Sequence, residues 1–250
     1  MCNFKSYVVT SDLKVHGSHQ TGSHEKIIES IGLKPLVDQD AILTRDRVCV
    51  EVTQKNKSKM TRNVRDWVYC EDETASLPEW YKKNKGRIEE TVFQQLMEDL
   101  KIQLVLNDEI REVTNVELYC FDSSTVISYG SSKVISYDSS TVESHGSSTV
   151  ISHGSSKVIS YGSSKVISYD SSTVISYDSS KVESYDSSKV ISYDSSKVIS
   201  YDSSKVVSHD SSTVELKSKY AFALSSSGKI IVNSNAVVVV KDGAFKNCEV

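Results

Sequence analysis

Residues 162–177 read GSSKVISYDSSTVISY, which is one pair of octapeptides from a run of twelve that continues without insertion from Asp122 to Lys217. The unit is Asp/Gly-Ser-Ser-Thr/Lys-Val-Ile/Glu-Ser-Tyr/His, and its eight places are called positions one to eight below. Valine holds position five in every copy, and the Ser-Ser pair holds positions two and three. Self-similarity at a fixed period is the mark of a repeat fold, so this run decides the architecture.

The pattern inside each octapeptide predicts one short strand followed by a turn. Side chains alternate across a strand, so positions three, five and seven (Ser, Val, Ser) share one face, and positions four, six and eight share the other. Charged residues such as Lys157, Glu143 and Glu183 stand on the second face and are too costly to bury unpaired. The Ser-Val-Ser face is therefore expected inside, with the Asp/Gly-Ser step as the corner.

Eight residues are too few to enclose a core, so two octapeptides per coil are expected. The predicted fold class is mainly β: a parallel β-solenoid of two close sheets with a small N-terminal α+β cap. Coils stacked at about 4.8 Å make the twelve repeats roughly 29 Å long. The inward Ser hydroxyls are expected to hydrogen-bond up the ladder. An antiparallel meander is the weaker model, because a single sheet leaves the Val face uncovered.

The same period continues past the perfect repeats. Counting by eights predicts further inward residues of larger size, which would close the ends of the core: Phe222, Leu224, Ile230, Val232, Val238 and Val240 on the C-terminal side, and Val116, Leu118 and Cys120 on the N-terminal side. The segment Val237–Val240 is apolar on both faces, so the tail Lys241–Val250 is expected to cover it.

The domain boundary is predicted near residue 115, with an α+β cap over 1–115 docked on a solenoid over 116–250. The expected cap elements are a helix over Glu25–Ile31, strands over 48–52 and Arg65–Cys70, and a helix over Leu77–Leu100 that begins with a capping box at Ser76. The stretch Lys101–Leu106 alternates apolar residues and is a candidate for the first coil.

Residues with the potential for chemistry are few. His16, His19 and His24 lie in a Gly/Ser-rich loop, and imidazole suits zinc or copper. No Cys, Asp or Glu stands at a recognised ligand spacing, so a solvated loop is favoured. Cys49 and Cys70 are interpreted as buried structural thiols. A catalytic Ser is singular, whereas here Ser recurs in every copy. We therefore predict no enzyme activity, no catalytic residues, no metal and no cofactor.

Charge and hydropathy set limits on partners and location. The chain carries a formal net charge of −4 with a pI of about 5.9, and the repeat holds eight Lys against eight Asp and three Glu. A nucleic-acid binder would show a basic surface, so none is predicted. Five widely spaced cysteines indicate reduced thiols. No apolar run is long enough for a membrane span, and a cytoplasmic location is expected.

The outward face predicts an interaction surface. Tyr or His occupies position eight in eleven copies, and Ile or Val occupies position six in nine. Continuous apolar stripes of this kind usually mark association surfaces, although stacking alone also stabilises parallel ladders. A protein partner or a homo-oligomer is therefore predicted. The predicted contact residues are Tyr129, Tyr161, Tyr177, Tyr193, Ile127, Ile159, Ile175 and Ile191.

The octapeptide, for example Tyr161-Gly162-Ser163-Ser164, resembles the repeat of bacterial ice nucleation proteins. It is similar also to Tyr-Asp/Gly-Ser-Ser repeats of uncharacterised bacterial and phage proteins. The resemblance covers 122–217 and implies sixteen-residue coils with stacked tyrosines. The first hypothesis is a non-enzymatic, self-associating or protein-binding scaffold, with a phage or prophage origin as one option. Ice binding or nucleation is the second, and a catalytic N-terminal segment with the rod as spacer is the third.

Overall fold

The computed structural model describes residues 4–17, 23–34, 46–56, 61–71, 77–107, 109–232, 236–240 and 248–249. Two compact units, Met1–Gln103 and Leu104–Val250, make up the chain.

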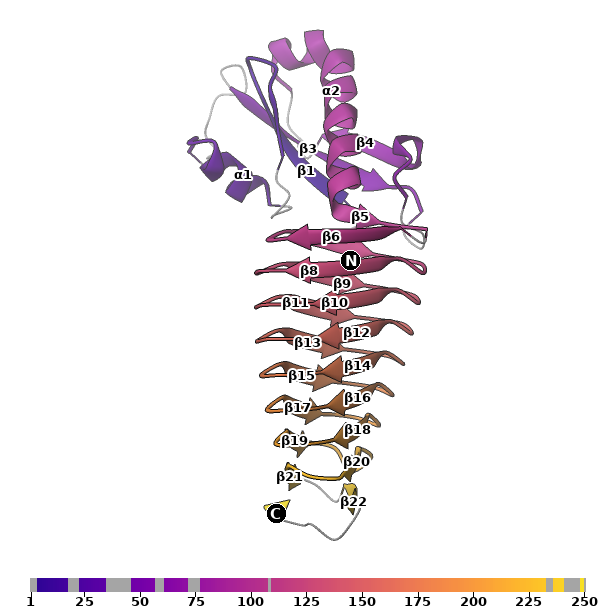
Figure 1. Ribbon diagram of the computed structural model, residues 1–250. Helices are drawn as coiled ribbons and strands as arrows, with labels where there is room; N and C mark the ends of the chain where they lie inside the picture. Colours follow the sequence, from indigo (N-terminus) through magenta and orange to yellow (C-terminus); the bar gives the residue numbers. More distant parts are fainter. Residues whose placement is uncertain are drawn as a thin grey trace. The chain divides into compact units, whose positions relative to one another are not determined.

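The second unit is a parallel β-solenoid built from two sheets (Figure 1). Its nine-stranded sheet contains β6 (Ile110–Thr114), β8 (Thr125–Tyr129), β10 (Thr141–Ser144), β12 (Lys157–Ser160), β14 (Thr173–Ser176), β16 (Lys189–Ser192), β18 (Lys205–Ser208), β20 (Phe222–Ser225) and β22 (Val237–Val240). Its ten-stranded sheet contains β5 (Leu104–Val105), β7 (Glu117–Cys120), β9 (Lys133–Ser136), β11 (Thr149–Ser152), β13 (Lys165–Ser168), β15 (Lys181–Ser184), β17 (Lys197–Ser200), β19 (Thr213–Leu216), β21 (Lys229–Val232) and β23 (Cys248–Glu249).

Successive strands of the chain alternate between the two sheets, so one coil contains two octapeptides. Each repeat strand pairs in parallel with the strand sixteen residues along: Val158 faces Val174, and Ser160 faces Ser176. The same position therefore stacks on the same position in every coil. This confirms the predicted fold class and the two-octapeptide coil.

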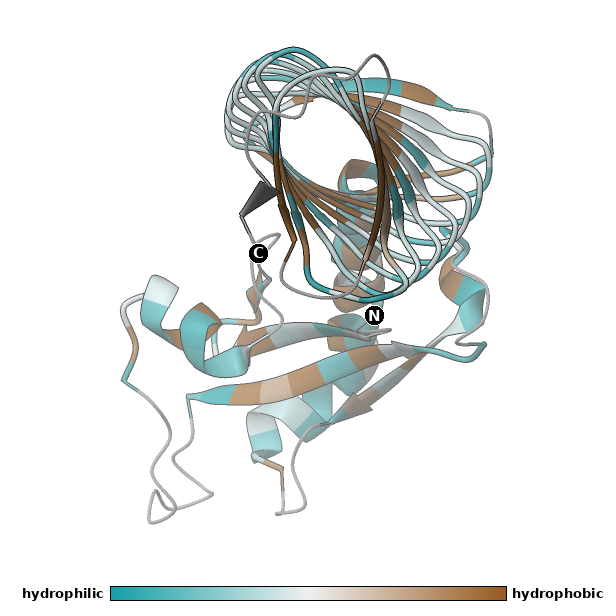
Figure 2. Ribbon diagram, turned by 90° about the horizontal axis from the view of Figure 1, so that it is seen from below, coloured by the Kyte–Doolittle hydropathy of each residue, from teal (hydrophilic) through white to brown (hydrophobic). Residues whose placement is uncertain are grey.

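The inward face is Ser-Val-Ser, as predicted. All twelve position-five valines are at most 1% exposed, and they form one continuous core cluster that also includes Leu118, Cys120 and Leu216. The serines at positions three and seven are fully buried beside them. Figure 2 shows hydrophobic residues gathered along the strands and hydrophilic residues at the turns. Small inward side chains allow the two sheets to pack closely, since no aromatic ring has to fit between them.

Each corner depends on a left-handed residue at position one. Asp186 has a φ of 55° and Gly162 a φ of 68°, and every position-one residue from Asp122 to Asp210 shares this sign. Asp and Gly are among the few residues that adopt this conformation at low cost, which explains why position one takes only these two. The position-three hydroxyl then secures the turn: Ser188 Oγ donates to the carbonyl of Tyr185 at 2.7 Å.

The Asp side chain adds a hydrogen bond between coils. Oδ2 of Asp186 accepts the backbone N–H of Asp170 at 3.1 Å, and Oδ2 of Asp170 accepts the N–H of Gly154 at 2.9 Å. Each carboxylate thus satisfies a turn donor of the preceding coil, which a glycine in the same place does not do.

The expected hydrogen bonding of inward Ser hydroxyls up the ladder holds only in part. Hydroxyls one coil apart are separated by about 4.8 Å, which exceeds the roughly 2.8 Å that a direct O–H···O bond between them requires. A few inward hydroxyls instead reach a carbonyl of a neighbouring coil, as Ser128 Oγ does with Glu143 at 3.5 Å, and others bond across the turn, as Ser208 does with Ser212 at 2.7 Å. Seven of the position-seven hydroxyls have no partner among the described residues: Ser136, Ser144, Ser152, Ser160, Ser168, Ser176 and Ser192.

The expected inward positions hold at one end of the repeat and fail in part at the other. Leu118, Cys120 and Ile230 are buried inward residues, and Val238 packs against the core. Phe222 and Leu224 do not point inward, because Val206 pairs with Ala223 rather than with Phe222. One additional residue between β19 and β20 reverses the alternation. Ala221 and Ala223 are the buried residues instead. The predicted covering tail lies mainly outside the described residues.

The solenoid begins earlier than the predicted boundary at residue 115. Both β5 and β6 already pair in parallel, with β7 and β8 respectively, so the unit starts at Leu104. Within β5 it is Val105, not Leu104, that lies opposite Cys120. The expected strand over Lys101–Leu106 is short, because the preceding helix continues to Gln103.

The first unit is an α+β region, as predicted. Its antiparallel sheet has the order β2-β1-β3-β4, formed by β1 (Phe4–Thr10), β2 (Val15–His16), β3 (Arg47–Gln54) and β4 (Trp67–Glu71). Its helices are α1 (His24–Ser30), the short 3-10 helix η2 (Val64–Asp66) and α2 (Glu79–Gln103). The sequence analysis found both α-helices and strands β3 and β4, but did not predict β1 or β2. The capping residue Ser76 lies outside the described residues.

We predict that Val190→Asp abolishes cooperative folding, whereas Ile191→Asp leaves the fold intact. Val190 is fully buried in the core column, so an unpaired carboxylate there costs on the order of 3–5 kcal/mol. Ile191 is only half-buried, and its register neighbours are Ile175 and Val207. A carboxylate at position 191 therefore reaches solvent and does not lie beside a like charge on these two neighbours. Thermal melts followed by circular dichroism compare the two variants, and the reverse ranking would contradict the assignment of faces.

We predict that Asp186→Ala destabilises the solenoid by about 1–2 kcal/mol, because alanine adopts a positive φ poorly. Asp186→Gly loses the same carboxylate but accepts the conformation, so it should cost less. Urea unfolding of the two variants and the wild type separates the conformational cost from the lost hydrogen bond. Equal destabilisation would show that the hydrogen bond to Asp170 dominates.

Candidate functional site

The position-eight side chains form two stacked columns, one at each edge of the coil. The first column, called here the Tyr129 column, contains Tyr129, His145, Tyr161, Tyr177, Tyr193 and His209. The second, called the Tyr137 column, contains Phe121, Tyr137, His153, Tyr169, Tyr185 and Tyr201. Neighbouring ring centroids lie 4.6–5.1 Å apart, with interplanar angles of 1–16°. The in-register backbone imposes this geometry, because each ring follows the same strand position.

The structure brings the predicted contact residues together on the outer face of the nine-stranded sheet. Ile159, Ile175 and Ile191 lie in direct register on β12, β14 and β16. Ile127 on β8 is separated from them by Glu143 of β10. The four predicted tyrosines belong to the Tyr129 column, which also contains His145 and His209. These histidines were outside the predicted contact set, although their place at position eight marks them as members.

Stacking leaves these residues less exposed than isolated surface side chains. Among the aromatic and Ile residues at positions six and eight of the repeat, Tyr129 is the most open at 39%, and the isoleucines are half-buried by the coils above and below. The aromatic and Ile side chains are therefore held in place by their neighbours and form ordered, partly apolar strips. This supports ladder stabilisation as well as association.

Burial and neighbouring charge alter the ionisation of the columns. Burial, reinforced by the carboxylate of Glu183, raises the pKa of Tyr185 to about 12, and the Tyr185 hydroxyl donates to Glu183 Oε2 at 3.4 Å. Burial also raises the pKa of Tyr177. Both phenols are thus neutral hydrogen-bond donors at physiological pH. Glu183 in turn pairs with Lys165 at 3.1 Å.

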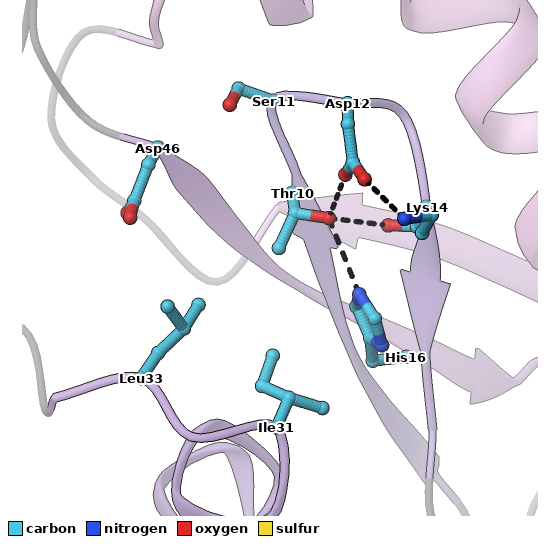
Figure 3. A pocket seen from close by; sticks show the side chains of 8 residues that line it. All are labelled: Thr10, Ser11, Asp12, Lys14, His16, Ile31, Leu33 and Asp46. Carbon is cyan, nitrogen blue, oxygen red and sulfur yellow. Dashed lines mark hydrogen bonds and ion pairs between the residues drawn. The ribbon is translucent and has the colours of Figure 1, made fainter.

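The first unit holds a shallow pocket of about 270 Å³ beside the β1–β2 hairpin (Figure 3). Thr10 Oγ1 donates to Asp12 Oδ1 at 2.5 Å and lies 3.3 Å from Nε2 of His16. Asp12 also pairs with Lys14 at 2.7 Å, and this contact together with the Thr10 hydrogen bond lowers its pKa to about 2. Ile31 and Leu33 form an apolar wall.

This hairpin does not assemble a catalytic triad. In a nucleophile–His–acid arrangement the carboxylate orients the imidazole, whereas Asp12 here bonds the hydroxyl and the lysine. The same contacts close a tight turn in which Leu13 has a φ of 63°. The geometry of this turn is sufficient to explain the contacts of Asp12 with Thr10 and Lys14.

The residues of the predicted histidine loop do not form a metal site in the part of the chain that the structure describes. His24 Nε2 contacts the carbonyl of Val50 at 3.0 Å, His16 contacts Thr10, and His19 lies outside the described residues. No group of three His, Cys, Asp or Glu is arranged for a metal within these residues. Cys49 is buried, as predicted, and so is Cys120, whereas the prediction that Cys70 is buried is wrong, because Cys70 is only half-buried.

Comparison with protein-family models, with curated proteins and with solved structures gives no match for this chain. The likeness to octapeptide-repeat proteins therefore stays a resemblance of the repeat alone. Within the described residues, neither α-helix combines the length and the apolar character needed to cross a bilayer.

We predict that His153 makes the solenoid lose stability in acid. Burial in the Tyr137 column lowers its pKa from the ordinary value of 6.5, and nearby Asp170 offsets this only in part. As the pH falls through 6.5, the unfolded chain therefore takes up more protons than the folded chain, and stability falls. His153→Tyr should extend the tyrosine stack and reduce the pH dependence of the free energy of unfolding.

Urea titrations above and below pH 6.5 measure this effect. His153→Phe is the control, because it removes the titration without adding a hydroxyl. An unchanged pH dependence in both variants would contradict the assignment to His153.

Proposed function

We propose that this protein is a non-enzymatic scaffold whose solenoid pairs with a second copy of the chain through the outer face of the nine-stranded sheet. The observation that carries the proposal is the pair of adjacent apolar strips on this face, namely the Tyr129 column and the isoleucines of β12, β14 and β16. Adjacent apolar strips on a protein surface commonly mark association sites.

Charge distinguishes the two outer faces. Across the twelve repeats, positions four and six of the nine-stranded sheet carry Lys157, Lys189, Lys205 and Glu143. The same positions of the ten-stranded sheet carry Lys133, Lys165, Lys181, Lys197, Glu183 and Glu215. Charged side chains, Lys above all, are depleted in interface cores because they must be desolvated there. The nine-stranded sheet is therefore the favoured contact face.

Stacking also prepares this face for association. A side chain that is already held by its neighbours loses little rotamer entropy on binding, and Tyr combines large apolar area with a polar end. Each ring of the Tyr129 column lies about 5 Å from the next, so the strip is ordered before any partner arrives. A twofold axis would place two identical strips against each other, which is the commonest symmetry of homodimers.

Light scattering across a range of protein concentrations tests the proposal. The wild type should reach twice the chain mass of 27.7 kDa. A variant with Tyr161, Tyr177 and Tyr193 changed to Ser should remain a monomer. The matched control changes Tyr169, Tyr185 and Tyr201 to Ser; it removes the same number of rings from the other column and should still dimerise.

Circular dichroism establishes that both triple variants are folded. If the first one unfolds, Ile159, Ile175 and Ile191 changed together to Thr test the same face while keeping β-branched side chains. A wild type that stays monomeric at every concentration would contradict the proposed pairing. Equal loss of dimer in both triple variants would show that the outer face of the nine-stranded sheet is not the specific contact surface.

A further inference from the structure

The two aromatic columns are not uniform along their length. In the Tyr129 column, Tyr161, Tyr177 and Tyr193 form an uninterrupted triplet between His145 and His209. In the Tyr137 column, Tyr169, Tyr185 and Tyr201 form a second triplet after His153. The remaining two tyrosines of the columns, Tyr129 and Tyr137, have no stacked tyrosine neighbour, because each contacts His or Phe.

We propose that the two tyrosine triplets are sites of oxidative cross-linking, in which a one-electron oxidant such as a high-valent haem peroxidase joins successive coils through dityrosine bonds. This modification is independent of the proposed self-association, since both tyrosines of each bond belong to one chain. Four stacked pairs qualify: Tyr161–Tyr177, Tyr177–Tyr193, Tyr169–Tyr185 and Tyr185–Tyr201.

Geometry favours these pairs over other tyrosines. The ring centroids of Tyr185 and Tyr201 lie 4.6 Å apart with an interplanar angle of 1°, so the two rings are parallel and in contact range. Neither ring is fully buried, and the χ2 torsion of Tyr is soft, so the rings can tilt into contact. Two radicals formed on adjacent rings can therefore react without any diffusion of the chain. Fixing two reactants next to each other in this way raises the rate of their reaction.

The reaction balances as follows for each pair. Each phenol loses one electron to the oxidant and its hydroxyl proton to a base, which gives two neutral phenoxyl radicals. The ring carbons beside the two C–O bonds then form a carbon–carbon bond. The hydrogen on each of these carbons moves to the phenolic oxygen and restores aromaticity. The product has lost two hydrogen atoms in total, as two protons and two electrons.

Tyr185 has a base in place for the proton. Its hydroxyl donates to Glu183 Oε2 at 3.4 Å, so the proton can move to this carboxylate as the electron leaves. Proton acceptors near a phenol ease its oxidation because they avoid a charged phenol cation. Both qualifying pairs of the Tyr137 column contain Tyr185, so this carboxylate is placed to assist both bonds.

The consequence of the modification is a covalent connection between coils that are otherwise held by non-covalent ladders. Each bond joins residues sixteen positions apart and closes a loop in the unfolded chain. Such closure lowers the entropy of the unfolded state, as a disulfide does, and so stabilises the folded rod. Oxidation of the triplets should therefore raise the unfolding temperature of the rod.

The experiment exposes dilute full-length protein to visible light with tris(bipyridine)ruthenium(II) and persulfate, which is a one-electron oxidant. Dityrosine fluorescence reports the yield, and gel filtration separates monomers from intermolecular products. Trypsin cleaves after the Lys residues of the repeat, and the four expected pairs give joined products of four different compositions in mass spectrometry. Residues 190–197 and 198–205 release the same peptide, VISYDSSK, and Tyr169 and Tyr177 share the peptide 166–181, so fragment spectra and the single variants Tyr193→Phe and Tyr201→Phe assign the joined residues. We expect these joined peptides in the monomer fraction.

Conservative variants give the controls. Tyr177→Phe keeps the stack and should eliminate both bonds of its column, while Tyr129→Phe should leave the yield unchanged. Glu183→Gln should lower the yield of the two Tyr185 bonds by severalfold and spare the Tyr177 bonds. In urea the selectivity should disappear, because the unfolded chain no longer stacks its tyrosines.

Three outcomes would overturn the inference. One is a joined peptide containing Tyr129 or Tyr137 at a yield equal to that of the triplets. The second is dityrosine found solely in intermolecular products. The third is the absence of dityrosine from folded protein under conditions that oxidise the urea-unfolded chain. An unchanged yield in Glu183→Gln would remove the assigned role of that carboxylate as the base.

Discussion

The structure depends on one constraint: every strand of the repeat must pair in parallel and in register with the strand sixteen residues away. Register of this kind puts Val on Val and Ser on Ser, so each inward side chain of the repeat packs against a residue of the same type in the next coil. Apolar residues gain from this arrangement, rings stack, and charges of the same sign repel. The outward positions are the ones that vary: Thr149 separates Lys133 from Lys165, although Lys165, Lys181 and Lys197 stack directly in register. The inward positions, which have no solvent to relieve a misfit, hardly vary at all.

Periodicity predicted the architecture because parity along a strand is a strict rule. Charged residues such as Lys157 and Glu143 on one face sufficed to assign inside and outside, and the Asp/Gly-Ser step located the corner. The left-handed conformation of position one is seen in the structure. Parity fails after a single added residue, and no period reveals where the chain takes up that residue. Phe222 and Leu224 were assigned inward for this reason, although Ala221 and Ala223 face the core. The hydroxyl pattern was also beyond the sequence, because it depends on distances across a turn rather than on residue types.

The candidate surface was predictable in position but not in character. Position eight located both aromatic columns, while the half-burial of the isoleucines follows from the contact between coils, which composition does not encode. The first unit shows the opposite case. Its strands β1 and β2 lack a long alternating pattern, and the contact that secures β1 to α2 is polar: the hydroxyl of buried Tyr7 donates to buried Asp99 at 2.8 Å. A pair ninety-two residues apart leaves no local signal in the chain.

The equivalence of the octapeptides has a consequence at the level of the gene. A DNA segment that encodes whole octapeptides can be gained or lost by slippage or unequal recombination without creating a new kind of contact inside the rod, because every interior position meets the same residue types as before. Such an event changes the length in steps of about 2.4 Å per octapeptide, half of the strand spacing. The outer rows are rearranged by the same event, so the order of His, Lys and Glu along the surface can be reshuffled while the core stays constant. A gain or loss of sixteen residues, which is one whole coil, thus changes rod length while the core contacts stay the same, whereas like charges that the event brings together in the outer rows still repel.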